Sequence, residues 1–352
     1  MPVWVRFPFL TSGFTNVSPL GRRSPQGLKP AVVQALNDTA EAVPYPKPIY
    51  ETRFRSSLMW FAVCALCALQ IACGSGGSLP VQTPVPPGQP TFTHVVLVVE
   101  ENYSYSEVIG NSSMPYFNSL ASQYGLATQY FADAHPSLPN YLMLTTGLTE
   151  TFDDNFSGTI SDDNVVRELV KAGKSWKSYA ESLPSAGYLG GDSGLYVRRH
   201  NPFTYLSDVQ NDSSQAANIV PFTQFSSDLA SDTLPQYSFI APDLMDDAHD
   251  GTLAQADAWL QTNIAPLIAN AAFQSHGLLI ITFDEGDQSD LDHVGGHVAT
   301  LVISSTAKKG FQSQTVYQHQ SALRLILAAS GVNNFPGLSA VAPDMTEFFT
   351  GH

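Results

Sequence analysis

Two stretches of the sequence run from apolar residues directly into carboxylates. Residues 94–102 read HVVLVVEEN and residues 278–287 read LLIITFDEGD, so five or six apolar, largely β-branched residues precede each acidic pair. Such a run predicts a strand buried on both faces of a parallel sheet, and the ligand crevice of an open α/β sheet lies at the carboxyl ends of its strands. Carboxylates gathered there repel one another unless a cation or a proton lies among them. The pattern therefore predicts a metal-dependent enzyme in which four side chains share one crevice: Glu101, Asn102, Asp284 and Glu285.

A third segment holds a serine between two prolines. Residues 135–147 read HPSLPNYLMLTTG, and this polar start leads into an apolar run that predicts a helix. Ser137 would then lie at a helix N-terminus, where backbone N–H groups and the helix dipole favour a phosphate. Serine is also an ordinary helix N-cap, so both interpretations stay open. A GxSxG motif is absent from the sequence, which argues against an α/β-hydrolase.

Acids and histidines are concentrated in two later segments. Residues 242–250 read PDLMDDAHD, which places four acids and a histidine within eight residues. These side chains form a dense set of oxygen and nitrogen ligands, although a solvated acidic loop would look the same. Residues 284–297 end in Gly-Gly-His, where the glycines allow close approach of the backbone. A lone histidine is usually structural, but two that closely follow a strand-end acidic pair favour a site.

The charge balance excludes some classes of partner. Residues 74–352 contain nine Lys and Arg against 28 Asp and Glu. Nucleic acids and anionic membranes bind through basic residues that displace counterions, so we expect neither as a non-specific partner. All three cysteines lie between residues 64 and 73, so the rest of the chain uses no disulfide or thiolate chemistry.

The N-terminal part has the pattern of an export signal. Arg53 and Arg55 precede an apolar run of about 15 residues, which ends at Cys73 and a Gly/Ser stretch. The run is shorter than the ~20 residues that span a membrane. Cys73 resembles the cysteine of a bacterial lipoprotein cleavage box, although Gln70 stands where that box usually has leucine. We expect an exported periplasmic, cell-surface or secreted protein, and a lipid on Cys73 would be its only membrane attachment.

The chain is expected to divide into four parts. These are an unstructured N-terminal extension at residues 1–52, the signal segment at 53–73, a Gly/Ser/Pro linker at 74–90 and one catalytic domain at 91–352. Within the domain, predicted strands alternate with predicted helices, which implies a parallel sheet covered by helices on both faces. The expected strands are 94–99, 175–181, 236–243, 278–283 and 297–305, and the expected helices are 115–124, 163–173, 250–270 and 321–331.

Together these motifs resemble the bacterial and fungal phosphoesterase family that contains secreted acid phosphatases and phospholipases C, a branch of the alkaline-phosphatase-like superfamily. The matching stretches lie in the family's order within residues 94–330: VVEENYSYSEVIGN, HPSLPNYLMLTTG, SWKSYAESLP, YVRRHNPFTYL, APDLMDDAHDG, FDEGD, GGHV and YQHQSALR. The resemblance implies the superfamily's α/β three-layer sandwich, with a mostly parallel central sheet between two layers of helices.

The resemblance also implies a role for each matching residue. Glu101, Asn102, Asp284 and Glu285 correspond to metal ligands, and Ser137 corresponds to the nucleophile, which is itself a ligand. His200 corresponds to a pocket histidine that acts in catalysis. Three residues fall near the superfamily's other metal site: Asp243 as a ligand, and His249 and His297 as catalytic groups. The number of divalent ions, one or two, stays open, because family members can hold one ion and use these groups on the phosphate.

The implied reaction is transfer of a phosphoryl group from a phosphate ester to Ser137, followed by hydrolysis of the phosphoserine. We expect an acid-phosphatase-like phosphomonoesterase, with phosphoinositides among its candidate substrates. A phospholipase C or another phosphodiesterase is the alternative, although that activity usually accompanies longer chains. A surface lipoprotein that binds metal or phosphate without turnover is the alternative of a different class. Because the crevice is acidic, we also expect protonated histidines to help to bind the phosphate.

Overall fold

The structure, a computed structural model, describes residues 90–350. The chain divides into two compact units, Met1–Ser75 and Gly76–His352, and all of the described residues belong to the second. The expected N-terminal extension, the signal segment with Cys73, and the linker up to residue 89 lie outside the described residues. Among the described helices, none combines the length and the apolarity that a membrane crossing requires.

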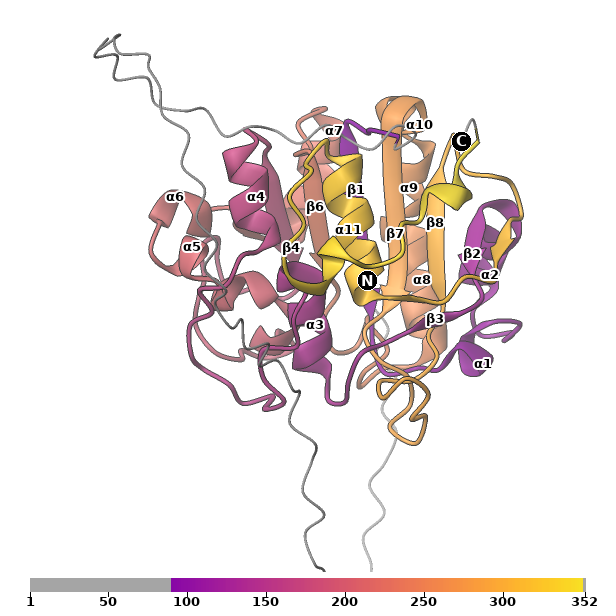
Figure 1. Ribbon diagram of the computed structural model, residues 1–352, viewed down its shortest axis with the longest axis horizontal. Coiled ribbons are helices and arrows are strands. Elements are labelled where there is room, and N and C mark those ends of the chain that lie inside the picture. Colours follow the sequence, from indigo (N-terminus) through magenta and orange to yellow (C-terminus); the bar gives the residue numbers. More distant parts are fainter. Residues whose placement is uncertain (1–89, 351–352) are drawn as a thin grey trace, which may run out of the picture. The chain divides into compact units, whose positions relative to one another are not determined.

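The core of this unit is an eight-stranded, mostly parallel sheet (Figure 1). Its strand order is β5 (Ile219–Pro221), β4 (Trp176–Ala180), β6 (Tyr237–Ala241), β1 (His94–Glu100), β7 (Gly277–Phe283), β8 (Thr300–Ser304), β2 (Gly125–Ala127) and β9 (Gln312–Ser313). The five strands from β5 to β7 are mutually parallel, whereas β8 is antiparallel to β7 and to β2. A small second sheet pairs β3 (Tyr130–Phe131) with β10 (Tyr317–Gln318).

The central position of β1 explains its composition. Its residues from Val95 to Val99 are fully buried, as expected for a strand with neighbours on both edges and helices on both faces. The register with β7 runs from His94 opposite Gly277 to Glu100 opposite Phe283. The two strands therefore end abreast, and the Asp284 N–H donates to the Glu100 carbonyl at 2.9 Å. This register brings the two acidic pairs to one edge of the sheet.

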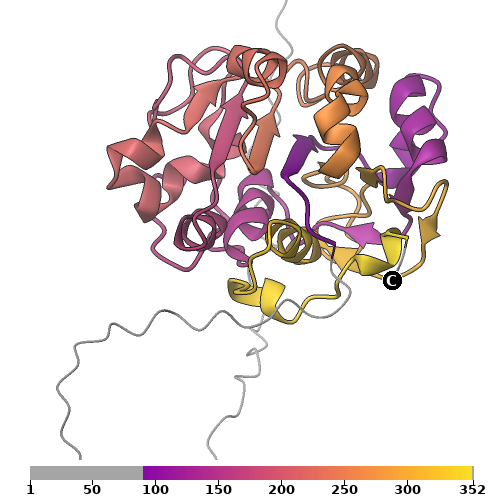
Figure 2. The ribbon, with the colours of Figure 1, turned by 90° about the horizontal axis from the view of Figure 1, so that it is seen from above.

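Helices cover both faces of the sheet (Figure 2). The layer with α3 and α11 lies on one face, and α8 to α10 lie on the other. The helices are α1 (Tyr105–Val108), α2 (Pro115–Gln123), α3 (Ser137–Thr146), α4 (Val165–Lys171), α5 (Ser207–Gln210), α6 (Ser213–Ala216), α7 (Thr223–Ala230), α8 (Leu253–Asn263), α9 (Ala265–Ala269), α10 (Ala271–His276) and α11 (His319–Ala329). Four short 3-10 helices complete the described elements: η1 (Arg198–His200), η2 (Pro202–Tyr205), η3 (Gly337–Ala340) and η4 (Thr346–Phe348). The expected three-layer α/β architecture is confirmed.

One element differs clearly from its prediction. The helix expected over residues 250–270 is interrupted after Asn263, and α9 begins at Ala265 with Pro266 in its first turn. Proline has no N–H to donate and its ring collides with the carbonyl four residues earlier, so it ends the preceding helix. Residues 182–222 follow the expected strand at 175–181 and have no predicted element, yet they contain η1, η2, α5, α6 and β5.

Candidate active site at the carboxyl edge of the sheet

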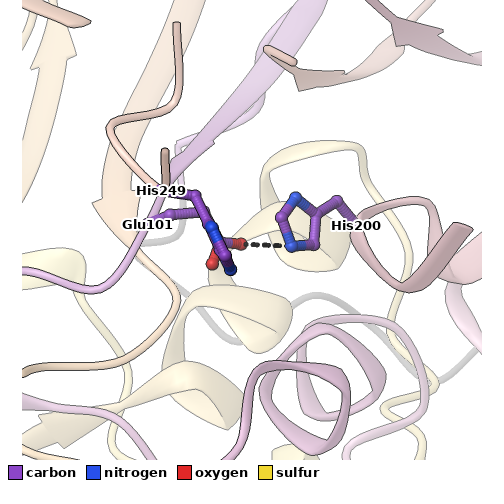
Figure 3. Close-up of side chains that lie close together, drawn as sticks. All are labelled: Glu101, His200 and His249. Carbon is purple, nitrogen blue, oxygen red and sulfur yellow. Dashed lines mark ion pairs between the residues drawn. The ribbon is translucent and has the colours of Figure 1, made fainter. Parts of the chain in front are cut away.

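Glu101 is the centre of a buried polar cluster at the carboxyl end of β1. Its Oε2 accepts from the Ser137 hydroxyl at 3.2 Å, and its Oε1 accepts a short hydrogen bond from the Tyr141 hydroxyl. His200 Nε2 lies 3.2 Å from the same Oε1, although the direction is not that of a hydrogen bond. Figure 3 shows the His200 ring directed at this carboxylate. Side chains from β1, α3 and η1 thus meet at one carboxyl group.

Asn102 and Asp284 complete the edge beside Glu101. Asn102 has a positive φ of 59°, a conformation that asparagine tolerates better than most residues. The turn directs the Asn102 N–H to Asp284 Oδ1 at 3.2 Å. Two buried oxygens here, Asn102 Oδ1 and Asp284 Oδ2, have no hydrogen-bond partner among the described residues. Buried oxygens are normally satisfied, so this pair fits a cation that these atoms would bind.

Ser137 is the first residue of α3 and is almost fully buried. Pro136 occupies the N-cap position, so the serine side chain does not cap the helix. Its hydroxyl instead lies between two carboxylates, 3.2 Å from Glu101 Oε2 and 3.4 Å from Glu285 Oε1. The Leu138 N–H donates to Asp154 Oδ1 at 3.0 Å, so a carboxylate already takes one of the free N–H groups at this helix end. The phosphate position expected at the N-terminus of α3 is therefore partly occupied by Asp154.

His135 was not among the predicted site residues, yet it contacts Glu285 directly. Its Nδ1 lies 2.7 Å from Glu285 Oε2, and its Nε2 lies 2.9 Å from the Asp290 carbonyl. The carbonyl oxygen can only accept, so Nε2 carries the proton. Nδ1 then bonds Glu285 either as an acceptor from the protonated acid or as the donor of an imidazolium. His135 therefore fixes the orientation of the acid that approaches Ser137.

His200 is buried between two acids and is stacked on Tyr141. Its Nδ1 lies 3.2 Å from Asp247 Oδ2, and its ring centroid lies 5.2 Å from that of Tyr141 at an interplanar angle of 11°. Burial, followed by the positive charges of Arg199 and His249, lowers the pKa of His200 well below its usual value. This direction is opposite to the one that the expected protonated histidine requires at this position. Burial and these nearby positive charges both favour the neutral form of the ring.

His249 lies at the rim of the same cluster, on the loop after β6. It is partly exposed, its Nδ1 lies 2.8 Å from Asp250 Oδ1, and its Nε2 lies 3.4 Å from an Arg199 guanidinium nitrogen. Ligand atoms of Glu101, His200 and His249 lie within 4.8 Å of one another. The structure thus brings His249 to the site together with Arg199, a cation that was not among the predicted site residues.

Two predicted site residues have their contacts elsewhere. Asp243 accepts from the Ser182 hydroxyl at 2.6 Å and groups with Glu181 and Asp246 rather than with Glu101. His297 places Nε2 3.0 Å from the Thr128 carbonyl. Its ring is stacked on Tyr105 with 4.4 Å between centroids. Neither set of contacts brings Asp243 or His297 to Ser137. A position close to predicted ligands in the sequence does not determine to which side of the sheet a side chain points.

The acids of the cluster carry strongly raised pKa values. Burial, followed by the charges of Asp284 and Asp247, raises the pKa of Glu101 well above its usual range. Burial also raises the pKa of Asp284 to about 7, that of Asp247 to about 8 and that of Glu285 to about 9. Each value expresses mainly the cost of burying a negative charge at this position. A divalent cation among these oxygens would remove that cost, so the donor set fits an oxygen-binding metal.

The loop that follows Glu285 is packed against the segment before Ser137. A Cβ added at Gly295 would lie 2.5 Å from the Ala134 nitrogen, and one added at Gly296 would lie 2.9 Å from the Gly286 Cα. No real side chain fits so close to backbone, so glycine is required for this approach. The approach carries Asp290 to His135, which in turn holds Glu285. The Gly-Gly pair singled out in the sequence therefore acts on the site through backbone packing.

Known proteins are similar to this chain in sequence and in fold. The sequence profile of the Phosphoesterase family matches residues 111–333. The phosphatidylinositol-3-phosphatase of Mycobacterium tuberculosis is 34% identical over 292 residues, which cover 82% of this chain and 93% of that protein. The acid phosphatase of Aspergillus fumigatus is 34% identical over 251 residues, 68% of this chain but 55% of that protein. The probable acid phosphatase of Kluyveromyces lactis is 32% identical over 246 residues, and 58% of its length is matched.

The chain thus spans little more than half the length of these two fungal relatives. Among solved structures, a Vibrio parahaemolyticus protein of the alkaline phosphatase superfamily superposes with a TM-score of 0.52 at 13% identity. The match covers 73% of this chain and 71% of that one, and at this identity it establishes the fold alone.

Proposed function

The chain belongs to the Phosphoesterase family, and from that premise we propose that it is a metal-dependent phosphomonoesterase with Ser137 as its nucleophile. The reaction class, hydrolysis of phosphoric ester bonds, follows from the family and from its phosphatase relatives. The observation that carries the residue assignment is the position of the Ser137 hydroxyl, which lies within 3.4 Å of two carboxylates from different strand ends.

The carboxylates beside Ser137 can take its proton. As the hydroxyl oxygen attacks phosphorus, the proton passes to Glu101 or Glu285, the phosphorus–oxygen bond to the alcohol breaks, and the alcohol leaves with a proton. Water then hydrolyses the phosphoserine by the reverse sequence. A divalent ion held by Glu101, Asn102, Asp284 and Glu285 would lower the pKa of the hydroxyl and neutralise charge on the phosphate.

The opposite side of Glu101 has the chemistry of an anion pocket. The Arg199 guanidinium lies 3.4 Å from His249 Nε2 and is a permanent cation. A second metal at Glu101, His200 and His249 would face this cation, which disfavours it. We therefore propose one catalytic ion, with Arg199 and His249 directed at phosphate oxygens. His249, the partly exposed histidine of the two, is the proposed acid for the leaving alcohol.

The neutral, buried His200 has a different role. It lies between Glu101 and Asp247 and is covered by Tyr141, so it holds these acids in place. It is therefore a positioning residue in this proposal rather than a proton donor.

The test is a substrate panel on the purified chain, before and after exhaustive chelation. Para-nitrophenyl phosphate and phosphoinositide monoesters should be hydrolysed, bis-para-nitrophenyl phosphate poorly or not at all, and chelation should abolish the activity until metal is restored. Ser137→Ala should lose all turnover, whereas Ser122→Ala, at an exposed serine of α2, should keep it. Preferred cleavage of the diester would favour the phosphodiesterase reading. Binding of phosphate without turnover of any ester would favour a binding protein.

We also propose that the protein is exported. Arg53, Arg55 and the apolar run before Cys73 support this, and fractionation of expressing cells tests it. Release of the protein from membranes by Cys73→Ser would support a lipid at this residue. Recovery of the intact chain from the cytosol alone would contradict export.

A further inference from the structure

Two consecutive acids, Glu100 and Glu101, stand at the end of β1 and point to different faces of the sheet. Glu101 points to Ser137 and α3, and the proposed reaction uses it. Glu100 is also fully buried, and the proposed reaction does not use it. Neither oxygen of Glu100 has a hydrogen-bond partner in the part of the chain that the structure describes. A buried carboxyl group without a donor or a counter-ion is costly, so Glu100 calls for a ligand that is absent from the protein itself.

The strand register shows which residues share the face of Glu100. Val98 of β1 and Tyr179 of β4 both lie opposite Ile240 of β6. Two residues further along, Glu100 and Glu181 therefore point to one face, because alternate residues of a strand share a face. Trp259 of α8 donates its indole N–H to Glu181 Oε1 at 3.1 Å, which identifies this as the face that α8 covers. Glu100 and Glu181 thus lie on the side opposite to Ser137 and α3.

Two further acids from the loop after β6 meet Glu181. Glu181, Asp243 and Asp246 each offer one carboxylate oxygen, and the three oxygens lie within 4.8 Å of one another. Calcium holds its oxygen ligands at about 2.3–2.6 Å, so ligands of one ion lie at most about 5 Å apart. The spacing of the three oxygens is therefore that of a single cation site.

Hydrogen bonds hold two of these acids in fixed orientations. Glu181 Oε2 accepts from the Asp243 N–H at 3.1 Å, Asp243 Oδ1 accepts from the Met245 N–H at 3.1 Å, and Asp243 Oδ2 accepts from the Ser182 hydroxyl at 2.6 Å. Each carboxylate oxygen keeps a second lone pair after accepting one such bond. The two acids are thus oriented before any ligand arrives, and they can still coordinate a cation.

The charges around this cluster are negative. Besides burial, the groups that act most strongly on Glu100 are Asp247, Asp246, Glu181 and Asp257, and all of them are acids. Burial raises the pKa of Glu181 and of Asp246, and the charge of Asp243 raises both further. A cation is the ligand that such a group of oxygens would bind.

We propose that Glu181, Asp243 and Asp246 bind a divalent cation of the calcium class, and that the unpartnered carboxyl group of Glu100 faces this ion from the sheet. Calcium is favoured because all three donors are carboxylate oxygens, whereas zinc and other transition metals prefer sites with nitrogen or sulfur. The ion joins the end of β4 to the loop of residues 242–251, which also contains the active-site residues Asp247 and His249. The site goes beyond the proposed phosphatase reaction and takes no part in its chemistry.

The test treats the full chain with a chelator and then measures calcium binding by equilibrium dialysis and the melting temperature by thermal unfolding. The variant Asp243→Asn/Asp246→Asn should bind one calcium equivalent fewer than the wild type and should lose the rise in melting temperature on calcium addition. The control Asp162→Asn/Asp232→Asn makes the same change in charge at two exposed acids and should behave as the wild type. An undiminished calcium equivalent in the first variant, or an equal loss in the control, would overturn the proposal.

A second variant covers the case in which the first fails to fold. Glu100→Gln replaces the unpartnered carboxyl group by an amide of nearly the same volume, so this variant should keep the fold. Its calcium affinity should fall at least tenfold, and an unchanged affinity would contradict a role for Glu100. Ser137→Ala separates the two proposals, since it should abolish turnover and keep this calcium equivalent. A chain without phosphatase activity that still shows the calcium loss in Asp243→Asn/Asp246→Asn would refute the proposed function alone.

Discussion

Replacement of Tyr141 by phenylalanine tests how the protein holds its central carboxylate. The Tyr141 hydroxyl donates to Glu101 Oε1, and His200 Nε2, although 3.2 Å from that oxygen, is not aligned to replace it. The ring of the variant can still stack on His200, so the fold should persist. A hydrogen bond to a charged group contributes about 1.5–3 kcal/mol. Loss of this hydrogen bond should therefore disfavour the ionised form of Glu101 by roughly 10- to 150-fold.

This loss should appear mainly in metal affinity. The ionised form of Glu101 is the one that binds a cation, so the metal concentration at half-maximal activity should rise by that factor in Tyr141→Phe. The kcat at saturating metal should fall much less. Metal binding measured by competition with a chelator gives the same quantity without any substrate. Tyr188→Phe is the matched control, because its hydroxyl bonds only the Gly191 carbonyl, at 3.1 Å, among the described residues.

The result that refutes this reasoning is a metal affinity within about twofold of the wild type, because the predicted loss starts at about tenfold. A fall in kcat alone would instead place Tyr141 in the chemical step. An equal change in Tyr188→Phe would indicate a general effect of losing a tyrosine hydroxyl.

Three further predictions concern other parts of the site. Burial raises the folded-state pKa of Glu285 to about 9, above its unfolded value. The stability gained from this protonation is therefore fully present below about pH 4.3 and is lost as the pH rises through 9. The melting temperature of the metal-free protein should fall from pH 5 to pH 9, and a flat profile in thermal scans would contradict this. Gly295→Ala should lower both melting temperature and activity, because its Cβ would lie 2.5 Å from the Ala134 nitrogen; a wild-type crystal structure and rate in this variant would exclude the packing argument. His249→Gln should reduce kcat by about 10²-fold or more, the usual range for a lost general acid. His297→Gln should mainly lower the melting temperature, since its ring bonds the Thr128 carbonyl. Comparable losses of kcat in both variants would restore a catalytic role for His297.

The parts of the site that could be predicted are those fixed by strand ends. Glu101 and Asp284 follow fully buried strands, and parallel register alone brings such ends together. Ser137 was marked by its flanking prolines, although only the structure shows that its side chain turns away from the helix cap. The interruption of the long helix at Pro266 could also have been predicted, since a proline in the interior of a helix breaks it.

The remaining site residues depend on tertiary contacts that a linear pattern does not contain. Tyr141 looks like a core residue of an apolar helix, and only its spacing of four from Ser137 indicates that both share one helix face. His135 and Asp247 act by holding other side chains, for which the sequence has no periodic signal. The family resemblance placed Asp243 near a second metal site, yet its loop turns it to Glu181 on the other side of the sheet. The neutral state of His200 depends on complete burial, which a loop sequence does not reveal.

The place of β1 in the sheet has a consequence for synthesis of the chain. The strand that is made first among the eight lies in the middle of the sheet, and both of its partners, β6 and β7, are made much later. About 140 residues separate Glu100 from Tyr237, so at about 5–20 residues per second the nascent strand waits roughly 7–30 s for its first partner. During this time the segment VVLVV, whose composition is that of an aggregation-prone strand, has no sheet to join. The ribosome must therefore release most of the domain before the centre of the sheet can form. Residues 95–99 are accordingly the segment that cellular factors must shield for the longest time.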